Sequence, residues 1–543
     1  MRAGSVRQEA GSAWPALRAL ALPGVLALWG ALASAQTVAQ PAAQPAAQTA
    51  AQTTAQATAQ ATAQAAAELP AALPPEISQA LAQARVADAN SAFVVLPLDG
   101  GALQLARHES LAMNPASTMK LLTTYAALGS LGPAYHWHTA VFASRPVQAG
   151  RLDGDLIVRG DGDPSLVIER WWLLVQRLRG MGLRDIHGDL VIDRSRFAAG
   201  LEGGPSLDGN ELRPYNVAPN ALLVNFKVLS LEFVPDHRAG IAHVLATPAL
   251  EGLSVPAQVP LSGGGCPDWK AQLRADFAQA HAVHFHGSYP GGCGSHTWHV
   301  SLLSPDAYAL ASFRALWRAA GGSFHGGVHE GRVPAAAIPL AVHESPPLTD
   351  VIRDINKNSN NVMARQLFLT LGAGPRGPAA ARDMPGSSAV AEGAEALLSA
   401  QAEEAEPASP ARAIAQVQAW LALQGLAMPE LVLENGSGLS RIERIAPASL
   451  ARLLVQAWNS RDMPNFLASL PQAGVDGTMK ERAAAGPAAY VKTGTLAEVR
   501  AVAGYVFASS GHRYAVVGII NDPHAEAAQA AHDAFLQWVW REG

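Results

Sequence analysis

NPASTMKLLTTYAAL, residues 114–128, is the stretch that decides how the rest of this chain is interpreted. Asn114 is a good helix N-cap and Pro115 suits a first helical turn, so the stretch predicts an apolar helix that starts here. Ser117 and Lys120 are three residues apart and share one face of that helix. A serine needs a base to become a nucleophile, and burial lowers the pKa of a lysine enough for it to act as one. Because S-x-x-K also arises by chance in many proteins, other motifs must decide its meaning.

Two more motifs follow in order along the chain. S-N-N at residues 359–361 precedes a predicted helix, and K-T-G at 492–494 lies on a predicted C-terminal strand. The set S-x-x-K, S-D-N and K-T-G, in this order, is typical of penicillin-binding proteins and class A β-lactamases, and S-N-N is an S-x-N variant of the second motif. Each motif lies on the expected kind of element, so together they indicate a serine acyl-transfer site.

Four side chains supply the predicted catalytic groups of that site. Ser117 attacks a carbonyl carbon, and Lys120 in its neutral form takes the proton of the serine. Ser359 lies between the two lysines and relays protons, and Asn361 offers its side-chain amide to the substrate peptide.

The K-T-G strand and the first helical turn supply the predicted binding groups. Lys492 provides a fixed positive charge for a terminal carboxylate, with Thr493 beside it, and Gly494 lets a ligand approach the strand backbone closely. An oxyanion hole needs two backbone N–H groups, and those of Ser117 and Thr495 are the natural candidates. This set of residues implies no metal ion and no cofactor.

The two ends of the chain predict a single α+β domain. A hairpin is expected around residues 99–101, and three further strands are expected at 489–496, 500–509 and 512–521. Helices are expected at about 76–88 and 524–540. We therefore expect an antiparallel sheet of about five strands, flanked by helices and built from residues 75–140 and 343–543.

Residues 141–342 form a different kind of region, rich in strand signals and turn glycines. GDLIV at 154–158 resembles GDLVI at 188–192, which suggests a small repeated β unit. This region is therefore predicted to be an insertion of one or two β-rich domains. Its Cys266 and Cys293 fit one structural disulfide in an oxidising compartment, and two unpaired thiols are the alternative.

The N-terminal residues predict export from the cytoplasm. Three arginines and an apolar run lead to ASA at 33–35, which is typical of signal peptide cleavage, so residues 1–35 are expected to be removed. An uncleaved anchor helix is the alternative. Residues 36–70, a low-complexity Ala/Gln/Thr/Pro segment, predict a linker, and the biased segment 373–410 predicts a flexible insertion loop.

Four other stretches resemble segments of a known family. They are RGDGDPSL at 159–166, PYNVAPNALLVNF at 214–226, ENGSGLSR at 434–441 and LPQAGVDGTMKER at 470–482. With the three motifs, they make residues 75–543 similar to low-molecular-mass class C penicillin-binding proteins, the D-alanyl-D-alanine carboxypeptidase/endopeptidase family. The resemblance implies a transpeptidase-like domain with inserted β-rich domains. It also implies a periplasmic enzyme that attacks peptidoglycan stem peptides and cross-links through an acyl-enzyme and is inhibited by β-lactams.

The resemblance also implies a pocket for the substrate side chain. Arg441, which closes ENGSGLSR, matches a family position that faces this side chain, and its planar fork suits the carboxylate of a diaminopimelate end. The amino group of that end needs an anionic partner from the insertion. Glu211 is the first candidate for it and Asp208 the second. The alternative is that Arg441 only braces its own loop.

Two other functions remain open at this point. A serine β-lactamase would share the acyl-enzyme but release β-lactams quickly, although no convincing deacylating glutamate is visible. A non-catalytic wall-binding protein would have no use for three intact motifs. Rapid turnover of β-lactam would favour the first, and absence of acylation by penicillin the second.

Composition and the remaining clusters say little about other partners. The formal net charge is −5 and the chain has no block of Lys and Arg, so no nucleic-acid partner is expected. Five histidines near Cys293 are expected to be surface residues rather than metal ligands: His281, His284, His286, His296 and His299. No oligomeric state follows from the sequence.

Overall fold

The computed structural model describes residues 72–201, 207–266, 268–279, 281–373, 406–483, 486 and 488–543. The predicted signal peptide, the 36–70 linker and most of the 373–410 insertion lie outside these residues. Among the residues that are described, no helix has both the length and the apolar character needed to span a bilayer.

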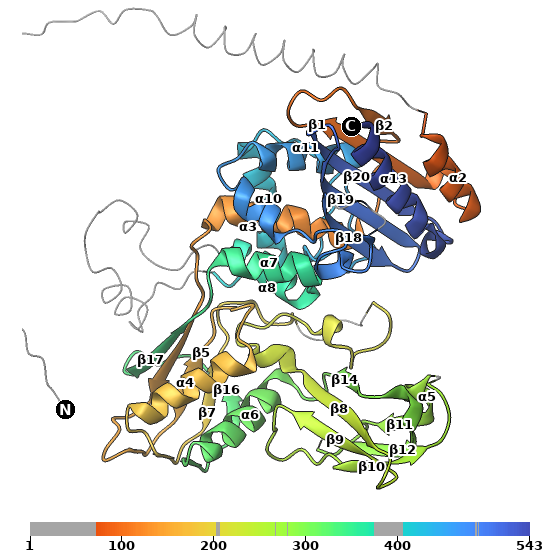
Figure 1. Ribbon diagram of the computed structural model, residues 1–543. Coiled ribbons are helices and arrows are strands. Elements are labelled where there is room, and N and C mark those ends of the chain that lie inside the picture. The colour runs from red at the N-terminus through yellow and green to blue at the C-terminus, as the bar shows by residue number, and fades with distance from the viewer. Residues whose placement is uncertain are drawn as a thin grey trace, which may run out of the picture. The chain divides into compact units, whose positions relative to one another are not determined.

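The N-terminal and C-terminal parts of the described chain meet in one five-stranded antiparallel sheet (Figure 1). Its strands, in spatial order, are β18 (Ala489–Leu496), β19 (Val499–Phe507), β20 (Arg513–Asn521), β1 (Ser91–Pro97) and β2 (Leu105–Arg107). Strand β1 pairs with β20 along its whole length, from Ser91↔Ile520 to Pro97↔Tyr514. The predicted α+β fold class is thereby confirmed.

Alternate residues of β1 face two different helix layers, because side chains along a strand point to opposite faces of the sheet. Phe93 and Val95 pack in a cluster with residues of α2 (Pro75–Gln83) and α13 (Gln529–Glu542). Ala92 and Val94 face the internal helices, which are α3 (Lys120–Leu131), α7 (Leu348–Asn358), α8 (Asn361–Ala373), α10 (Pro410–Leu423), α11 (Pro447–Trp458) and α12 (Met463–Ser469). Short 3₁₀ turns complete the domain: η1 (Asp88–Asn90), η2 (Ala116–Met119), η7 (Gly477–Met479) and η9 (Ala525–Ala528).

Helix α3 is enclosed by the layer of internal helices. Ten of its 12 residues are buried, as expected for a helix whose sequence is apolar on nearly every side. Its start differs from the prediction. The left-handed backbone at Ala116 (φ +44°) turns the chain, so Asn114 Oδ1 accepts a hydrogen bond from Ala116 N (2.9 Å) and does not cap the helix. The helix begins instead with the 3₁₀ turn η2, which contains Ser117.

The insertion contains a five-stranded mixed sheet. Its strands, in spatial order, are β16 (Val328–Glu330), β7 (Leu190–Asp193), β5 (Leu156–Arg159), β3 (His138–Ala143) and β17 (Ile338–Glu344). The two similar pentapeptides supply β5 and β7, which pair in parallel with matching positions opposite each other, from Leu156↔Leu190 to Arg159↔Asp193. The pairing of His138 with Glu344 shows that this sheet begins a few residues outside the predicted 141–342 range.

Two further sheets and several short elements complete the insertion. A second five-stranded sheet has the order β13 (Tyr289–Pro290), β10 (Gln258–Ser262), β9 (Ile241–Thr247), β8 (Leu229–Asp236) and β14 (His296–Val300). A small parallel sheet contains β15 (Ser323–Phe324), β6 (Asp185–Ile186) and β4 (Arg151–Leu152), and β11 (Leu273–Asp276) pairs with β12 (His284–Gly287). The helical elements are α4 (Ile168–Gly180), α5 (Trp269–Gln272), α6 (Pro305–Ala319), η3 (Pro214–Asn216), η4 (Val224–Lys227) and η5 (Gly291–Cys293). A disulfide joins Cys266, after β10, to Cys293 in η5.

Buried polar contacts attach the insertion to helix α8. Gln366 on α8 accepts a hydrogen bond from Asn220 N and donates one to Asn220 O, both 2.9 Å long. Because α8 begins at Asn361, these contacts support the helix that carries the S-N-N motif.

Candidate active site

The three sequence motifs come together beside strand β18, an edge strand of the first sheet. Lys120 Nζ lies 2.9 Å from Ser117 Oγ and 2.6 Å from Asn361 Oδ1. Lys492 Nζ lies 2.9 Å from Ser359 Oγ. The site therefore contains two serine–lysine pairs, one at the start of α3 and one between α7 and β18.

Two glycines allow the backbone around Ser117 to be closely enclosed. A Cβ on Gly494 would lie 2.7 Å from Pro115 O and 3.1 Å from Ser117 N, so only glycine lets β18 approach this turn. Gly438 has a φ of +78°, and a Cβ there would overlap Ala116 O. The strand and the 434–441 loop thus hold the turn that carries Ser117 from two sides.

Lys120 is completely buried and surrounded by hydrogen-bond acceptors. Besides Ser117 and Asn361, it contacts the carbonyl oxygen of Ser437. Burial is the main cause that holds the pKa of Lys120 well below its usual range, and the charges of Lys492 and Arg365 lower it further, against the opposing effect of Glu443. A neutral amine has two N–H donors and one lone pair. The donors can serve the two carbonyl oxygens while the lone pair accepts the proton of the serine.

Lys492 is also completely buried, but its surroundings differ. It donates to Ser359 Oγ and, over 2.7 Å, to Thr493 O. Burial lowers the pKa of Lys492 to about 7. The sequence predicts a fixed positive charge here, and burial without a bound anion disfavours that charge. An anion bound next to Lys492 would raise the pKa and complete the charge.

Ser359 owes its position to the end of helix α7. It has a left-handed backbone (φ +53°) and follows the last helical residue, Asn358, as the C-cap. Asn361 begins α8 immediately afterwards, so the short link between the two helices presents both side chains of the motif. A left-handed backbone is uncommon for a residue other than glycine, and such outliers gather at functional sites.

Glu443 is a residue of the site that the motifs did not reveal. Its carboxylate is fully buried, and Oε1 accepts three backbone hydrogen bonds, from the N–H groups of Glu434 (3.1 Å), Asn435 (3.0 Å) and Gly436 (2.9 Å). Burial raises its pKa, although these three hydrogen bonds act in the opposite direction. Glu443 therefore fixes the loop whose Ser437 carbonyl contacts Lys120. The only signal in the sequence was an acidic residue two positions after ENGSGLSR.

The segment 470–482 links helix α7 to strand β18. Asp476 forms an ion pair with Lys357 (2.6 Å), near the end of α7. Thr493 Oγ1 donates to Thr478 Oγ1 over 2.8 Å. A Cβ on Gly477 would lie 2.6 Å from Lys357 O, so this glycine is required for the close approach. The segment thus connects the end of α7, which Ser359 follows, to the strand that carries Lys492.

The residues predicted to read the substrate side chain are not joined to one another. Arg441 is exposed, and its Nη1 lies 3.5 Å from Ala497 O, next to the end of β18. Glu211 is exposed as well, while Asp208 is engaged with Tyr215, Arg213 and Asn216. Among the described residues, no ion pair links Arg441 to either acid. The side-chain pocket and the oxyanion role of Thr495, which is exposed on β18, remain predictions.

The histidines near the disulfide do not build a ligand set with it. In the part of the chain that the structure describes, His296 alone of the five lies close to both Cys266 and Cys293. The two sulfur atoms are bonded to each other and have no thiolate to offer a metal ion. His284, His286, His296 and His299 are exposed on β12 and β14.

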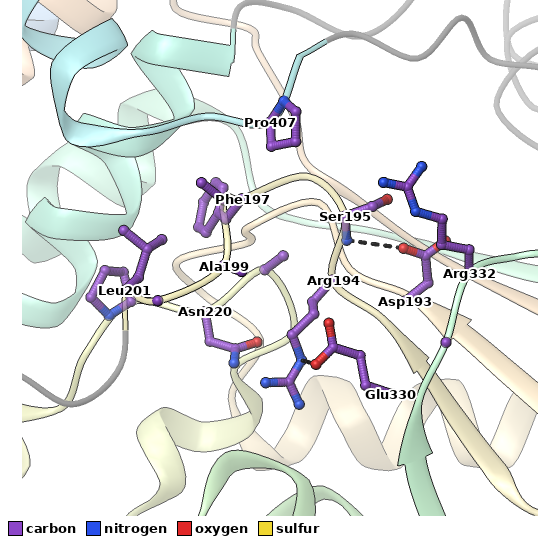
Figure 2. Close-up of a pocket in the computed structure, with 15 residues that line it drawn as sticks. Asp193, Arg194, Ser195, Phe197, Ala199, Leu201, Asn220, Glu330, Arg332 and Pro407 are labelled. Atoms are coloured by element: carbon purple, nitrogen blue, oxygen red, sulfur yellow. Dashed lines mark hydrogen bonds and ion pairs between the residues drawn. The ribbon is translucent and has the colours of Figure 1, made fainter.

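A cavity of about 450 Å³ is lined by residues of the insertion and by Pro407, outside the three motifs. Figure 2 shows Arg194 and Glu330 together on one side of it and Phe197 and Pro407 on the other. The closest approach of Arg194 Nε to Glu330 Oε2 is 3.7 Å. None of its lining residues belongs to S-x-x-K, S-N-N or K-T-G, so we assign it no part in the site described above.

Comparison with known proteins identifies the family. The model of the D-Ala-D-Ala carboxypeptidase 3 (S13) family matches residues 73–392 and 384–541, which include all three motifs and the insertion. The chain belongs to this family. Its predicted membership of the low-molecular-mass class C penicillin-binding proteins is confirmed by this match.

Two curated proteins and one solved structure illustrate what this chain is similar to. It is 27% identical over 453 residues to the D-alanyl-D-alanine carboxypeptidase DacB of Haemophilus influenzae, covering 81% of this chain and 87% of the relative. It is 28% identical over 445 residues to the D-alanyl-D-alanine carboxypeptidase of an Actinomadura species, covering 77% and 74%. The crystal structure of penicillin-binding protein 4 (dacB) from Haemophilus influenzae superimposes with a TM-score of 0.66 at 24% identity, covering 86% of this chain and 99% of that one, and shows the same fold.

Proposed function

We propose that this protein is a serine-type D-Ala-D-Ala carboxypeptidase and endopeptidase that acts on peptidoglycan peptides through an acyl-enzyme and is inhibited by penicillin. The observation that carries the proposal is the buried Lys120 amine, 2.9 Å from the hydroxyl of Ser117. Burial and neighbouring cations hold the pKa of Lys120 well below its usual range, which favours the neutral form that a base needs. Membership of the S13 family and the names of the enzymes in it support the same reaction.

Acylation follows from the position of the first serine–lysine pair. Neutral Lys120 takes the proton of Ser117 while Oγ attacks the carbonyl carbon of the bond between the two D-alanines. The backbone N–H groups of Ser117 and Thr495 hold the oxygen as its negative charge develops. The C–N bond then breaks, and the proton held by Lys120 passes through Ser359 to the departing amine. An ester on Ser117 remains.

Deacylation uses the same groups with water as the nucleophile. Lys120 takes a proton from the water that attacks the ester carbonyl, and it returns a proton to Ser117 Oγ as the ester breaks. The shortened peptide leaves and the free enzyme is restored. When the departing amine belongs to another stem peptide rather than to free D-alanine, the same steps cleave a cross-link.

Lys492 and its neighbours bind the terminal carboxylate of the substrate. The pKa of about 7 means that the empty site holds this charge only partly, and that binding of a carboxylate is coupled to uptake of a proton. The site thereby avoids a buried, uncompensated ammonium group when no substrate is present. The hydroxyl group of Ser359 lies beside the amine of Lys492, and Thr493 follows Lys492 on strand β18.

The periplasm is the compartment that fits these features. Residues 1–35 have the pattern of a signal peptide, and a disulfide in the insertion is typical of an oxidising compartment. The substrate, a wall peptide, is met outside the cytoplasmic membrane. Recovery of the mature protein in a periplasmic extract, with Gln36 at its N-terminus, tests this part of the proposal.

A fluorescent penicillin followed by a peptide digest tests the function. The protein should become labelled and hold the label through denaturing electrophoresis, and it should then release D-alanine and separate cross-linked fragments of peptidoglycan. Rapid loss of the label with accumulation of hydrolysed penicillin would show a β-lactamase. Absence of both labelling and peptide cleavage, in a protein with an intact circular dichroism spectrum, would show a non-catalytic wall-binding protein.

A further inference from the structure

A cluster of two histidines and one aspartate lies in the insertion, on residues that the proposed reaction does not use. Asp185, His187 and His325 each present one side-chain ligand atom, and these atoms all lie within 4.8 Å of one another. The cluster belongs to none of the three motifs and to none of the stretches that resemble family segments.

Strand register explains why these residues meet. Strands β6 and β15 pair in parallel, with Ser323 opposite Asp185 and Phe324 opposite Ile186. The next residues along the two strands are His325 and His187, so the histidines stand side by side at the strand ends. Since residues two apart on a strand share a face, His187 lies on the same side as Asp185. A regular strand geometry therefore builds the cluster.

The ligand atoms of the cluster lie close together, and one pair, His325 with Asp185, has the spacing of two ligands of one ion. His187 Nε2 lies 2.6 Å from Asp185 Oδ2, and His325 Nε2 lies 3.3 Å from Asp185 Oδ1. The imidazole rings are 4.9 Å apart between centroids. Ligand atoms about 2.0–2.1 Å from a tetrahedral ion are about 3.3 Å from each other, so modest rotation of the two histidine side chains would make room for an ion.

The hydrogen bonding and the exposure of the cluster also fit a metal site. Ser323 Oγ donates to Asp185 Oδ1 and orients the carboxylate, as outer partners of metal ligands commonly do. His325 and Ser323 also border a hollow of about 300 Å³, which leaves space for water molecules as further ligands. The side chains of Asp185 and His187 are 30% and 36% exposed, so an ion from solution can reach them.

We propose that Asp185, His187 and His325 form a solvent-open site for a divalent first-row transition-metal ion such as Zn²⁺. Two imidazoles and a carboxylate are ligands that Zn²⁺ and other divalent first-row transition-metal ions prefer, and water completes the coordination. The ion ties β6 to β15, two strands whose residues Asp185 and Ser323 are 138 positions apart in the chain. It thus stabilises the insertion and has no part in the acyl-transfer chemistry.

Zn²⁺ titration of the full protein, without an affinity tag and after removal of metal with EDTA, tests the proposal. Calorimetry with ZnCl₂ and elemental analysis after dialysis should both find one ion bound by these residues per chain. His187→Gln and His325→Gln should each weaken that binding by about tenfold or more. Co²⁺ in place of Zn²⁺ should give visible absorption bands in the wild type that both variants lose.

His329→Gln is the matched control. His329 Nδ1 lies 3.3 Å from Asp189 Oδ2, so it forms a histidine–aspartate pair of the same kind. This pair belongs to neither of the candidate ligand groups found among the described residues. This variant should bind Zn²⁺ like the wild type. Circular dichroism and labelling by fluorescent penicillin should be unchanged in all three variants, which excludes misfolding as the cause of lost binding. Absence of Zn²⁺ binding in the wild type, or equal binding in the wild type and both cluster variants, would overturn the proposal.

Discussion

The α3 side and the β18 side of the site each hold a fully buried lysine 2.9 Å from a serine hydroxyl. The pairs look alike in distance, but the pKa of Lys120 lies well below its usual range while that of Lys492 is lowered to about 7. Lys120 has two neighbouring cations, Lys492 and Arg365, in addition to its burial. Burial is the main cause of the lowered pKa at both lysines, and neighbouring cations lower it further at Lys120 alone. We therefore expect the same residue type to act as a base in one place and as a carboxylate-binding cation in the other.

Replacing each lysine by arginine should separate the two roles most strongly. Arginine keeps a positive charge and cannot give up its proton. Lys120→Arg should therefore reduce the rate of acylation by penicillin by about 10³-fold or more. Lys492→Arg keeps a positive charge at this position, so it should lose only about tenfold of the same rate. Both rates are measured by stopped-flow acylation of proteins with matched unfolding temperatures. Equal losses in the two variants would contradict the division of roles.

The pH dependence of peptide hydrolysis should show the conditional charge of Lys492. The charged form, which binds the carboxylate, is present below the pKa of about 7 and is lost as the pH rises through it. For a peptide with a free C-terminal carboxylate, kcat/KM should therefore fall by about tenfold per pH unit above this value. A peptide with a C-terminal amide, measured in parallel, should lack this alkaline decline. The same decline for both peptides would assign it to another group.

Loss of Glu443 should affect acylation at Ser117, on the α3 side, more than binding of a carboxylate at Lys492, on the β18 side. Its carboxylate fixes the 434–436 backbone, which leads to the Ser437 carbonyl beside Lys120. Glu443→Ala leaves three buried N–H groups without their acceptor, so it should lower the acylation rate by about 10-fold and the free energy of unfolding by about 1–3 kcal/mol. Inhibition by a carboxylate product that contacts only Lys492 should change less than twofold, as measured by its inhibition constant.

Replacement of Arg441 should have the smallest effect on activity, and it tests whether the protein binds the diaminopimelate end of the substrate. Arg441→Ala should weaken hydrolysis of a peptide with a diaminopimelate end by about fivefold to tenfold, because a charge-assisted contact is lost. Acylation by a simple penicillin, which has no such end, should change less than twofold. Arg444→Ala in the same loop is a suitable control. Parallel losses for both substrates would mean that Arg441 braces its loop and does not contact the side chain.

Much of this arrangement could be predicted from the sequence, because it depends on residue type and local pattern. The motif at 114–120 identifies the serine and the lysine by their spacing on one helical turn, and the alternating strands near the C-terminus predict the sheet that holds Lys492. The similar pentapeptides predict a repeated β unit, and in the structure they form adjacent parallel strands in matched register.

Other features depend on contacts between residues distant in the chain, and the sequence does not encode them in any local pattern. Asp185 and His325 meet only through the register of two parallel strands. The lowered pKa of Lys492 depends on how completely the neighbouring segments bury it. The predicted start of α3 at Asn114 is wrong, because strand β18 and the 434–441 loop, which approach through Gly494 and Gly438, enclose the left-handed turn at Ala116.

Mapping the penicillin adduct by mass spectrometry tests most directly which of the two serine–lysine pairs contains the nucleophile. Intact mass of the wild type after treatment with penicillin G should show one adduct, and digestion should locate it on the peptide that contains Ser117. Ser117→Ala should show none, while Ser359→Ala should still be acylated, more slowly. An adduct on Ser359, or one that persists in Ser117→Ala, would contradict the account.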